Sequence, residues 1–116
     1  MITPININPN DISLVPYGEE FLETTFRWIN DPRIADPFLF NRKVSKKAHL
    51  SWFDSIKKDH TQCLFGVLDG NNQYVGNLGF KSLDRAEPEM WLYIGPEHQG
   101  QGWGKQAAIA GVKTGL

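Results

Sequence analysis

The stretch 91-WLYIGPEHQGQGWGKQAA-108 joins an apolar segment to an alanine-rich one through three closely spaced glycines. The first part, which ends at Ile94, has the aromatic and branched residues of a buried strand. The segment from Gly104 to Val112 is rich in helix-forming alanine. A helix that begins directly after a glycine loop presents unpaired amides and a partial positive charge, and both attract phosphate. The stretch therefore predicts a strand, an anion-binding turn and a helix.

Two widespread phosphate motifs do not fit this turn. The Walker A pattern requires Gly-Lys followed by Ser or Thr, whereas Gly104-Lys105 is followed by Gln106. The dinucleotide pattern G-x-G-x-x-G, started at Gly100, would need a glycine where Lys105 stands. We therefore exclude both motifs.

The rest of the chain predicts one strand, two helices and then three strands before the last helix. Period-2 and period-3.6 patterns place these elements at 12–17, 19–30, 46–59, 63–68, 74–83 and 88–94. The predicted apolar faces of the two helices consist of Phe21, Leu22, Phe26 and Ile29, and of Ala48, Trp52, Phe53 and Ile56. Ser45 is the expected cap of the second helix, and Gly76 and Gly79 suggest close approach of another backbone. The order β-α-α-β-β-β-α predicts an α+β fold with a mostly antiparallel sheet flanked by helices.

Length and charge limit the kind of protein. The 116 residues suit one domain, 11–116, after an arm at 1–10 that is rich in Asn and Pro. A formal net charge of -1 gives no basic field for nucleic acid or an anionic membrane. We expect a cytoplasmic protein, because Cys63 is the single cysteine and the start lacks the apolar region of a signal peptide.

The pattern Gln99-x-x-Gly102-x-Gly104, directly after "YIGP", resembles the pyrophosphate loop of the GCN5-related N-acetyltransferase (GNAT) superfamily. The order of elements is also similar to the amino-terminal part of that family, and the resemblance covers the chain from about Ile12 onward. The family pattern usually continues with a strand, a helix and a hairpin that are missing here, so we expect a truncated domain. The alternative is a tight strand-to-helix turn that binds no ligand.

The resemblance implies an acetyl-CoA site without a metal. Amides near the glycines would hold the coenzyme pyrophosphate, and Lys105 would add positive charge. The strand before the loop would pair with pantetheine through its backbone. The implied cofactor-binding residues are Leu92, Tyr93, Ile94, Gln99, Gly100, Gln101, Gly102, Trp103, Gly104 and Lys105.

The resemblance also implies that a primary amine attacks the thioester, so a group must accept a proton from the amine. Strand alternation places Glu89, Trp91 and Tyr93 on one face, and a carboxylate beside aromatic rings can serve as a general base. We therefore predict Glu89 as the base, with a solvated strand-edge carboxylate as the alternative. A backbone amide near Tyr93 or Ile94 would polarise the thioester carbonyl. The histidines show no metal-ligand spacing, and we expect His49, His60 and His98 at the surface.

The expected function is acetyl transfer from acetyl-CoA to a primary amine, either an amino sugar nucleotide or a protein or peptide α-amine. The alternative is a non-catalytic module that binds coenzyme A or dimerises. Residues 33–44 predict a loop with an apolar tip, and the resemblance places this loop at the family's variable acceptor-binding region. Phe38 and Phe40 of the tip either line that region or pack beneath it. Because the expected truncation would expose a strand edge, we predict a homodimer formed through 88–116.

Overall fold

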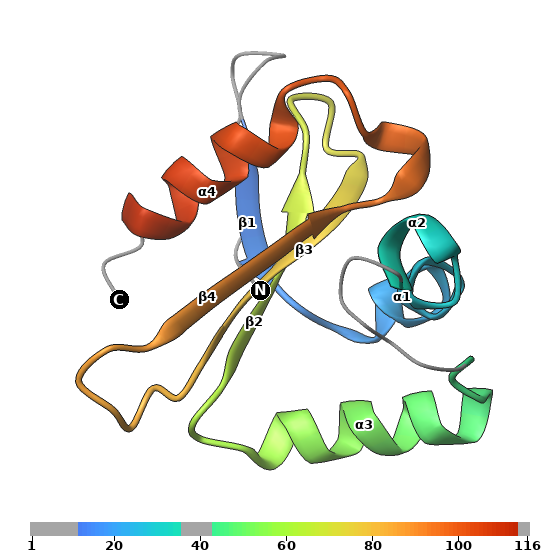
Figure 1. Cartoon of the computed structure of the whole chain (residues 1–116), viewed down its shortest axis with the longest axis vertical. Helices are drawn as coiled ribbons and strands as arrows, with labels where there is room; N and C mark the ends of the chain where they lie inside the picture. The colour runs from blue at the N-terminus through green and yellow to red at the C-terminus, as the bar shows by residue number, and fades with distance from the viewer. Residues whose placement is uncertain (1–11, 36–42, 114–116) are drawn as a thin grey trace.

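The computed structural model of the chain describes residues 12–35 and 43–113 (Figure 1). Its strands are β1 (Ser13–Pro16), β2 (Cys63–Leu68), β3 (Tyr74–Lys81) and β4 (Glu89–Ile94). Its α-helices are α1 (Leu22–Ile29), α2 (Pro32–Ala35), α3 (Lys46–Lys58) and α4 (Trp103–Lys113), and η1 (Glu19–Phe21) and η2 (Pro96–His98) are short 3-10 turns. The predicted order of the main elements is confirmed. The additional α2 occupies the start of a segment that the sequence predicts as a loop.

The four strands form one antiparallel sheet in the order β1-β2-β3-β4, so the predicted mostly antiparallel sheet is confirmed. Strand β3 is paired on both sides, whereas β1 and β4 are the edges of the sheet among the described residues. The register between β3 and β4 places Gly76 opposite Ile94 and Gly79 opposite Trp91. This pairing brings the end of β4, and therefore the start of the loop after it, beside the beginning of β3.

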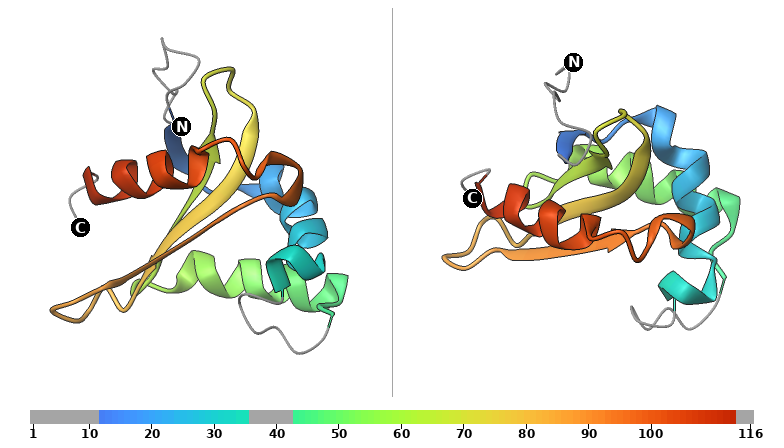
Figure 2. Two further views of the ribbon diagram at one scale, coloured as in Figure 1. Left: turned by 45° about the horizontal axis from the view of Figure 1, so that its top comes forward. Right: turned by 90° about the horizontal axis from the view of Figure 1, so that it is seen from above.

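Helices cover both faces of the sheet (Figure 2). Helix α4 packs on one face, where Ala107 joins Val67, Val75 and Leu78 in a fully buried apolar cluster. Helices α1 and α3 cover the other face. Alternation along β4 divides its side chains between these two faces, with Tyr93 toward α1 and α3 and Leu92 toward the α4 cluster.

Helix α3 confirms its predicted start but not its whole predicted face. The Ser45 hydroxyl accepts a hydrogen bond from the Ala48 amide at 3.1 Å, as expected of an N-cap. Phe53 is buried, but Ala48 is exposed and His49 is only 3% exposed. The prediction of a surface His49 is therefore wrong, because the Leu22 carbonyl of α1 supplies its ring with a hydrogen-bond partner.

Helix α1 shows only part of the predicted face, because Phe21, in η1 just before it, is buried as predicted while the other three predicted residues are half-buried. Its buried residues are Thr25 and Trp28, and Trp28 is only 1% exposed. Both carry polar atoms that form hydrogen bonds with distant parts of the chain, Thr25 with Tyr74 and Trp28 with Glu97. The spacing of apolar residues along the helix carries no information about such hydrogen-bond partners.

The two strand glycines are sites of close approach. A Cβ at Gly76 would lie 2.4 Å from the carbonyl oxygen of Tyr93, so the predicted approach of another backbone is confirmed there. At Gly79 a Cβ would instead meet the indole of Trp91, also at 2.4 Å. Both glycines therefore let β4 lie close to β3.

Several predictions concern parts of the chain outside the described residues, namely the arm at 1–10 and the apolar tip that contains Phe38 and Phe40. Among the described helices, none combines the length and the apolar composition needed to cross a membrane.

Candidate active site

The turn between β4 and α4 contains two glycines in a backbone conformation that favours glycine. Gly100 and Gly102 have φ angles of +84° and +81°, in the left-handed region. No heavy atom lies within 4 Å of the position that a Cβ would occupy at either residue. The turn therefore leaves open space directly above its backbone.

The amides at the start of α4 have no acceptor within the helix. Gln106 is the first residue of this region whose amide reaches back to the loop, with 3.4 Å to the Gly102 carbonyl. The amides of the preceding turn belong to a helix N-terminus, which has a partial positive charge. Lys105 is exposed in the same turn. The junction can therefore hold an anionic group, and Gly102 leaves room for it.

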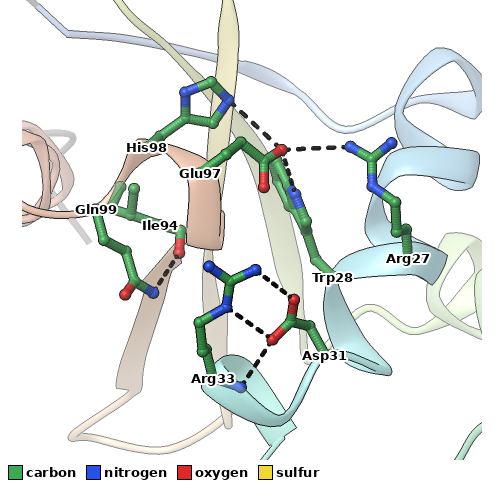
Figure 3. A network of polar contacts seen from close by, with 8 residues as sticks. All are labelled: Arg27, Trp28, Asp31, Arg33, Ile94, Glu97, His98 and Gln99. Carbon is green, nitrogen blue, oxygen red and sulfur yellow. Dashed lines mark hydrogen bonds and ion pairs between the residues drawn. The ribbon is translucent and has the colours of Figure 1, made fainter.

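A polar network fixes this loop to α1 (Figure 3). The Trp28 indole nitrogen donates to a Glu97 carboxylate oxygen at 2.9 Å, and Arg27 contacts the same oxygen at 3.3 Å. The Trp28 ring also lies so close to Gly95 that a Cβ there would approach it to 2.3 Å. Desolvation raises the pKa of Glu97, but the Trp28 hydrogen bond and the charges of His98 and Arg27 outweigh it, so the net pKa lies below the ordinary value.

The predicted pantetheine-binding positions lie on β4, at the sheet edge. The Gln99 side chain folds back and donates to the Ile94 carbonyl at 3.0 Å (Figure 3). The Gly95 amide donates to the Val75 carbonyl of β3 at 2.7 Å. These two bonds hold the end of β4 in place immediately before the glycine turn.

A cavity of about 390 Å³ opens on the face covered by α1 and α3, on the other side of β4 from the α4 cluster. Its size is at the lower end of the range of small-molecule sites. The residues that line it come from α1, α3, β2, β3, β4 and the segment before α3, and they are Thr25, Ile29, Val44, His49, Trp52, Leu64, Asn77, Lys81, Trp91 and Tyr93.

Two stacked pairs of aromatic rings line the cavity. On β4, the rings of Trp91 and Tyr93 have centroids 6.0 Å apart and planes inclined by 20°. On α3, the rings of His49 and Trp52 are 5.3 Å apart and nearly parallel, at 11°. The sheet and the helix therefore each contribute a flat aromatic surface.

Hydroxyl and amide groups form a network at the base of the cavity. The Asn77 amide nitrogen donates to the Tyr93 hydroxyl oxygen at 2.9 Å, and the Tyr74 hydroxyl donates to the Asn77 carbonyl oxygen. The Thr25 hydroxyl lies 2.9 Å from Tyr74 and accepts from Tyr17 at 2.7 Å. Asn77 is 1% exposed, so its hydrogen bonds are needed to offset the loss of water.

The tyrosines of this network stay neutral. Burial raises the pKa of Tyr17 to about 12 and raises those of Tyr74 and Tyr93 further, although hydrogen bonds from neighbouring side chains partly oppose the effect. The base of the cavity is therefore polar but uncharged near neutral pH.

His49 is the buried imidazole of the site. Its Nε2 lies 2.9 Å from the Leu22 carbonyl oxygen, which can only accept a hydrogen bond. This contact assigns the ring hydrogen to Nε2 and leaves Nδ1 as the proton-accepting nitrogen. Sequence reasoning missed this residue, since a single histidine within a helix has no distinguishing pattern.

Glu89, the predicted base, is exposed at the start of β4. Its carboxylate lies 3.4 Å from the ammonium of Lys81, which lines the cavity, whereas Glu89 does not. The structure thus brings Trp91 and Tyr93 together at the cavity, as strand alternation predicts, with Glu89 beyond it. Within the described ranges, no three His, Cys, Asp or Glu side chains gather into a metal-binding group.

Comparison with known sequences bears directly on this arrangement. The profile of the acetyltransferase (GNAT) domain matches residues 11–115, which is nearly the whole chain. The chain belongs to the GNAT acetyltransferase family. An N-acetyltransferase 9-like protein from Nematostella vectensis is 27% identical over 124 aligned residues, which cover 92% of this chain and 61% of that protein. The chain thus spans about three-fifths of this curated relative.

Solved structures of the family share the fold. Spermidine N-acetyltransferase from Vibrio cholerae, solved with CoA and spermine, superposes with a TM-score of 0.78 at 17% identity, over 89% of this chain and 62% of that one. An acetyltransferase from Thermus thermophilus gives a TM-score of 0.71 at 19% identity, over 95% of this chain and 72% of that one. At such low identities, the structural similarity shows a shared fold and nothing about substrates.

Proposed function

We propose that this GNAT domain transfers an acetyl group from acetyl-CoA to a primary amine. The observation that carries the proposal is the junction of an edge strand, a turn with two left-handed glycines and an unpaired helix N-terminus. In this proposal the pyrophosphate is bound by the backbone of Gln99 to Lys105. The backbone of Leu92 to Ile94 pairs with pantetheine and polarises the thioester carbonyl.

The acceptor amine approaches from the cavity that Trp91 and Tyr93 line. Its nitrogen forms a bond to the acetyl carbonyl carbon and gives up a proton to a base. The carbon–sulfur bond breaks, and coenzyme A leaves as a thiolate that takes a proton from water. We propose Glu89 as the acceptor of the amine proton, through a water molecule. His49 is a second candidate because it lines the cavity and its Nδ1 is a proton acceptor.

The relative solved with spermine supports an amine as the acceptor. The proposed acceptors are an amino sugar nucleotide and the α-amine of a protein or peptide. The cytoplasmic location and the homodimer also remain predictions. A CoA-binding module without catalysis is the alternative, and binding of acetyl-CoA without turnover of any amine would favour it.

The test of the loop uses a matched pair, Gly102→Asp and Gly102→Asn. Both variants place a similar side chain on the same left-handed backbone, but only Asp adds a negative charge near the pyrophosphate. We expect Gly102→Asp to bind acetyl-CoA at least about tenfold more weakly than Gly102→Asn in calorimetry, since a nearby like charge costs more than about 1.4 kcal/mol. Equal affinity of the two folded variants would contradict the assignment of this loop.

A further inference from the structure

We propose that the cavity binds a primary amine that has one aromatic group close to its nitrogen and no second charge, and that it binds this amine in the neutral form. The proposal rests on acetyl transfer to an amine as the function, and it narrows the class of acceptor.

The aromatic part of the acceptor is inferred from the walls. The Trp91–Tyr93 pair on β4 and the His49–Trp52 pair on α3 both line the cavity. Flat rings pack well in offset or edge-on arrangements against such surfaces, and they lose little conformational entropy when they bind. Apolar side chains from α1, β2 and the segment before α3 complete the lining, and these are Ile29, Leu64 and Val44.

The position of the amine nitrogen is inferred from the base of the cavity. Thr25, Asn77 and Tyr93 place a hydroxyl, an amide and a phenol there, joined by the network described above. A neutral amine both donates and accepts hydrogen bonds, so it suits these groups. The aromatic group then lies against the rings while the nitrogen lies at the polar base.

The absence of a second charge is inferred from the ionisable groups around the cavity. They are Lys81 from β3, His49 from α3 and Tyr93 from β4, while α1 and β2 contribute none. No carboxylate is among the described lining residues, and Glu89, beyond the lining, is paired with Lys81. An ammonium would lose water here without gaining a counter-ion among the described lining residues. The cavity thus favours the neutral amine, and a polyamine, which keeps further charges, is excluded.

The four tryptophans of the chain allow binding to be measured without catalysis. Trp52 and Trp91 line the cavity, whereas Trp28 binds Glu97 and Trp103 begins α4 after the glycine turn. Indole N–H signals of the whole ¹⁵N-labelled chain, assigned by single Trp→Phe variants, report each position separately. The probes are 2-phenylethylamine, the peptide Phe-Gly-Gly-amide and spermidine.

We expect 2-phenylethylamine to shift the Trp52 and Trp91 signals and to leave that of Trp103 unchanged. Alkylamines titrate near pH ~10, so the neutral fraction rises about tenfold per pH unit between pH 7 and pH 9, and the Kd should fall about tenfold per unit. The control is 2-phenylethanol, which is neutral throughout and should bind with a Kd independent of pH. The peptide α-amine titrates near pH ~8, so the two amines are compared at equal concentrations of the neutral form. On that basis, stronger binding of Phe-Gly-Gly-amide would identify a peptide amino terminus as the source of this chemistry, and binding of the free amine alone a small metabolite.

A pair of variants on α3 tests the aromatic wall. Trp52→Ala should raise the Kd of 2-phenylethylamine about tenfold. Leu50→Ala, on the exposed side of the same helix and outside the lining, should not change it. Unchanged Trp28 and Trp103 signals would show that both variants are folded.

Three results would overturn the inference. The first is that spermidine shifts the Trp52 and Trp91 signals at or below the concentration at which 2-phenylethylamine shifts them. The others are a Kd of 2-phenylethylamine that does not depend on pH, and equal affinities of the Trp52 and Leu50 variants for it. Acetyl-CoA is titrated separately, and the Trp103 signal reports it. Failure of acetyl-CoA to bind while the amine binds would reject the proposed function, not the cavity.

Discussion

At the scale of single residues, the main chemical question is which group accepts the amine proton. We expect Glu89→Gln to lower kcat about 10²-fold and leave acetyl-CoA affinity unchanged, because the amide keeps the shape of the carboxylate but cannot take a proton. The control is Glu87→Gln, two positions earlier and also exposed. Release of coenzyme A during turnover of an active amine measures the effect.

The other candidate for the proton acceptor is His49. The variant His49→Gln tests it, because the glutamine amide can still donate a hydrogen bond to the Leu22 carbonyl but cannot accept a proton. Unaltered turnover of Glu89→Gln, together with a large loss in His49→Gln, would assign the proton-accepting role to His49. An equal loss of turnover in Glu87→Gln would show that Glu89 acts only through its negative charge at the surface and not as a proton acceptor.

At the scale of elements, the close packing of β3 against β4 positions the site. A Cβ at Gly76 would lie 2.4 Å from the backbone oxygen of Tyr93. This oxygen cannot move away without disturbing the pairing of β4 with β3, in which Gly76 lies opposite Ile94. We expect Gly76→Ala to lower the free energy of unfolding by about 1–3 kcal/mol, measured by urea denaturation. In the control Gly18→Ala, the Cβ would meet only the carboxylate of Glu20, an exposed and flexible side chain. Equal stabilities of the two variants would contradict this account.

At the scale of the whole molecule, β3 is the centre of the fold. It is paired on both sides, and its residues from Val75 to Phe80 are all buried. Strands β1 and β4 are the edges of the described sheet. We therefore expect the β3 amides to show the slowest hydrogen exchange, limited by global unfolding, and the edge strands to exchange faster. Slower exchange in α4 than in β3 would indicate a different order of stability.

This central sheet also separates the two proposed binding sites in space. The glycine turn begins α4 on one face, while the aromatic cavity lies on the other, under α1 and α3. Strand β4 takes part in both, since Leu92 faces the α4 cluster and Tyr93 faces the cavity. In the proposed function, the coenzyme and the amine therefore meet at the edge strand.

The sequence by itself determined the local features of this protein. The strand, glycine turn and helix around Gly102, the N-cap at Ser45 and the order of the elements follow from propensities and spacings that act over a few residues. Their local physical cause explains why the family resemblance and the loop could be recognised without a structure.

Only the tertiary structure decided which polar side chains became the interior of the site. Trp28 binds Glu97, 69 residues away, and Asn77 meets Thr25 across 52 residues. The burial of His49 likewise depends on a carbonyl of another helix. A side chain with a polar atom, including a Trp or His ring, is buried at little cost only where a partner satisfies its hydrogen bonds, and chain folding alone brings those partners together. No periodicity in the sequence encodes such a pairing, so the cavity, with its aromatic walls and uncharged polar base, emerged only with the fold.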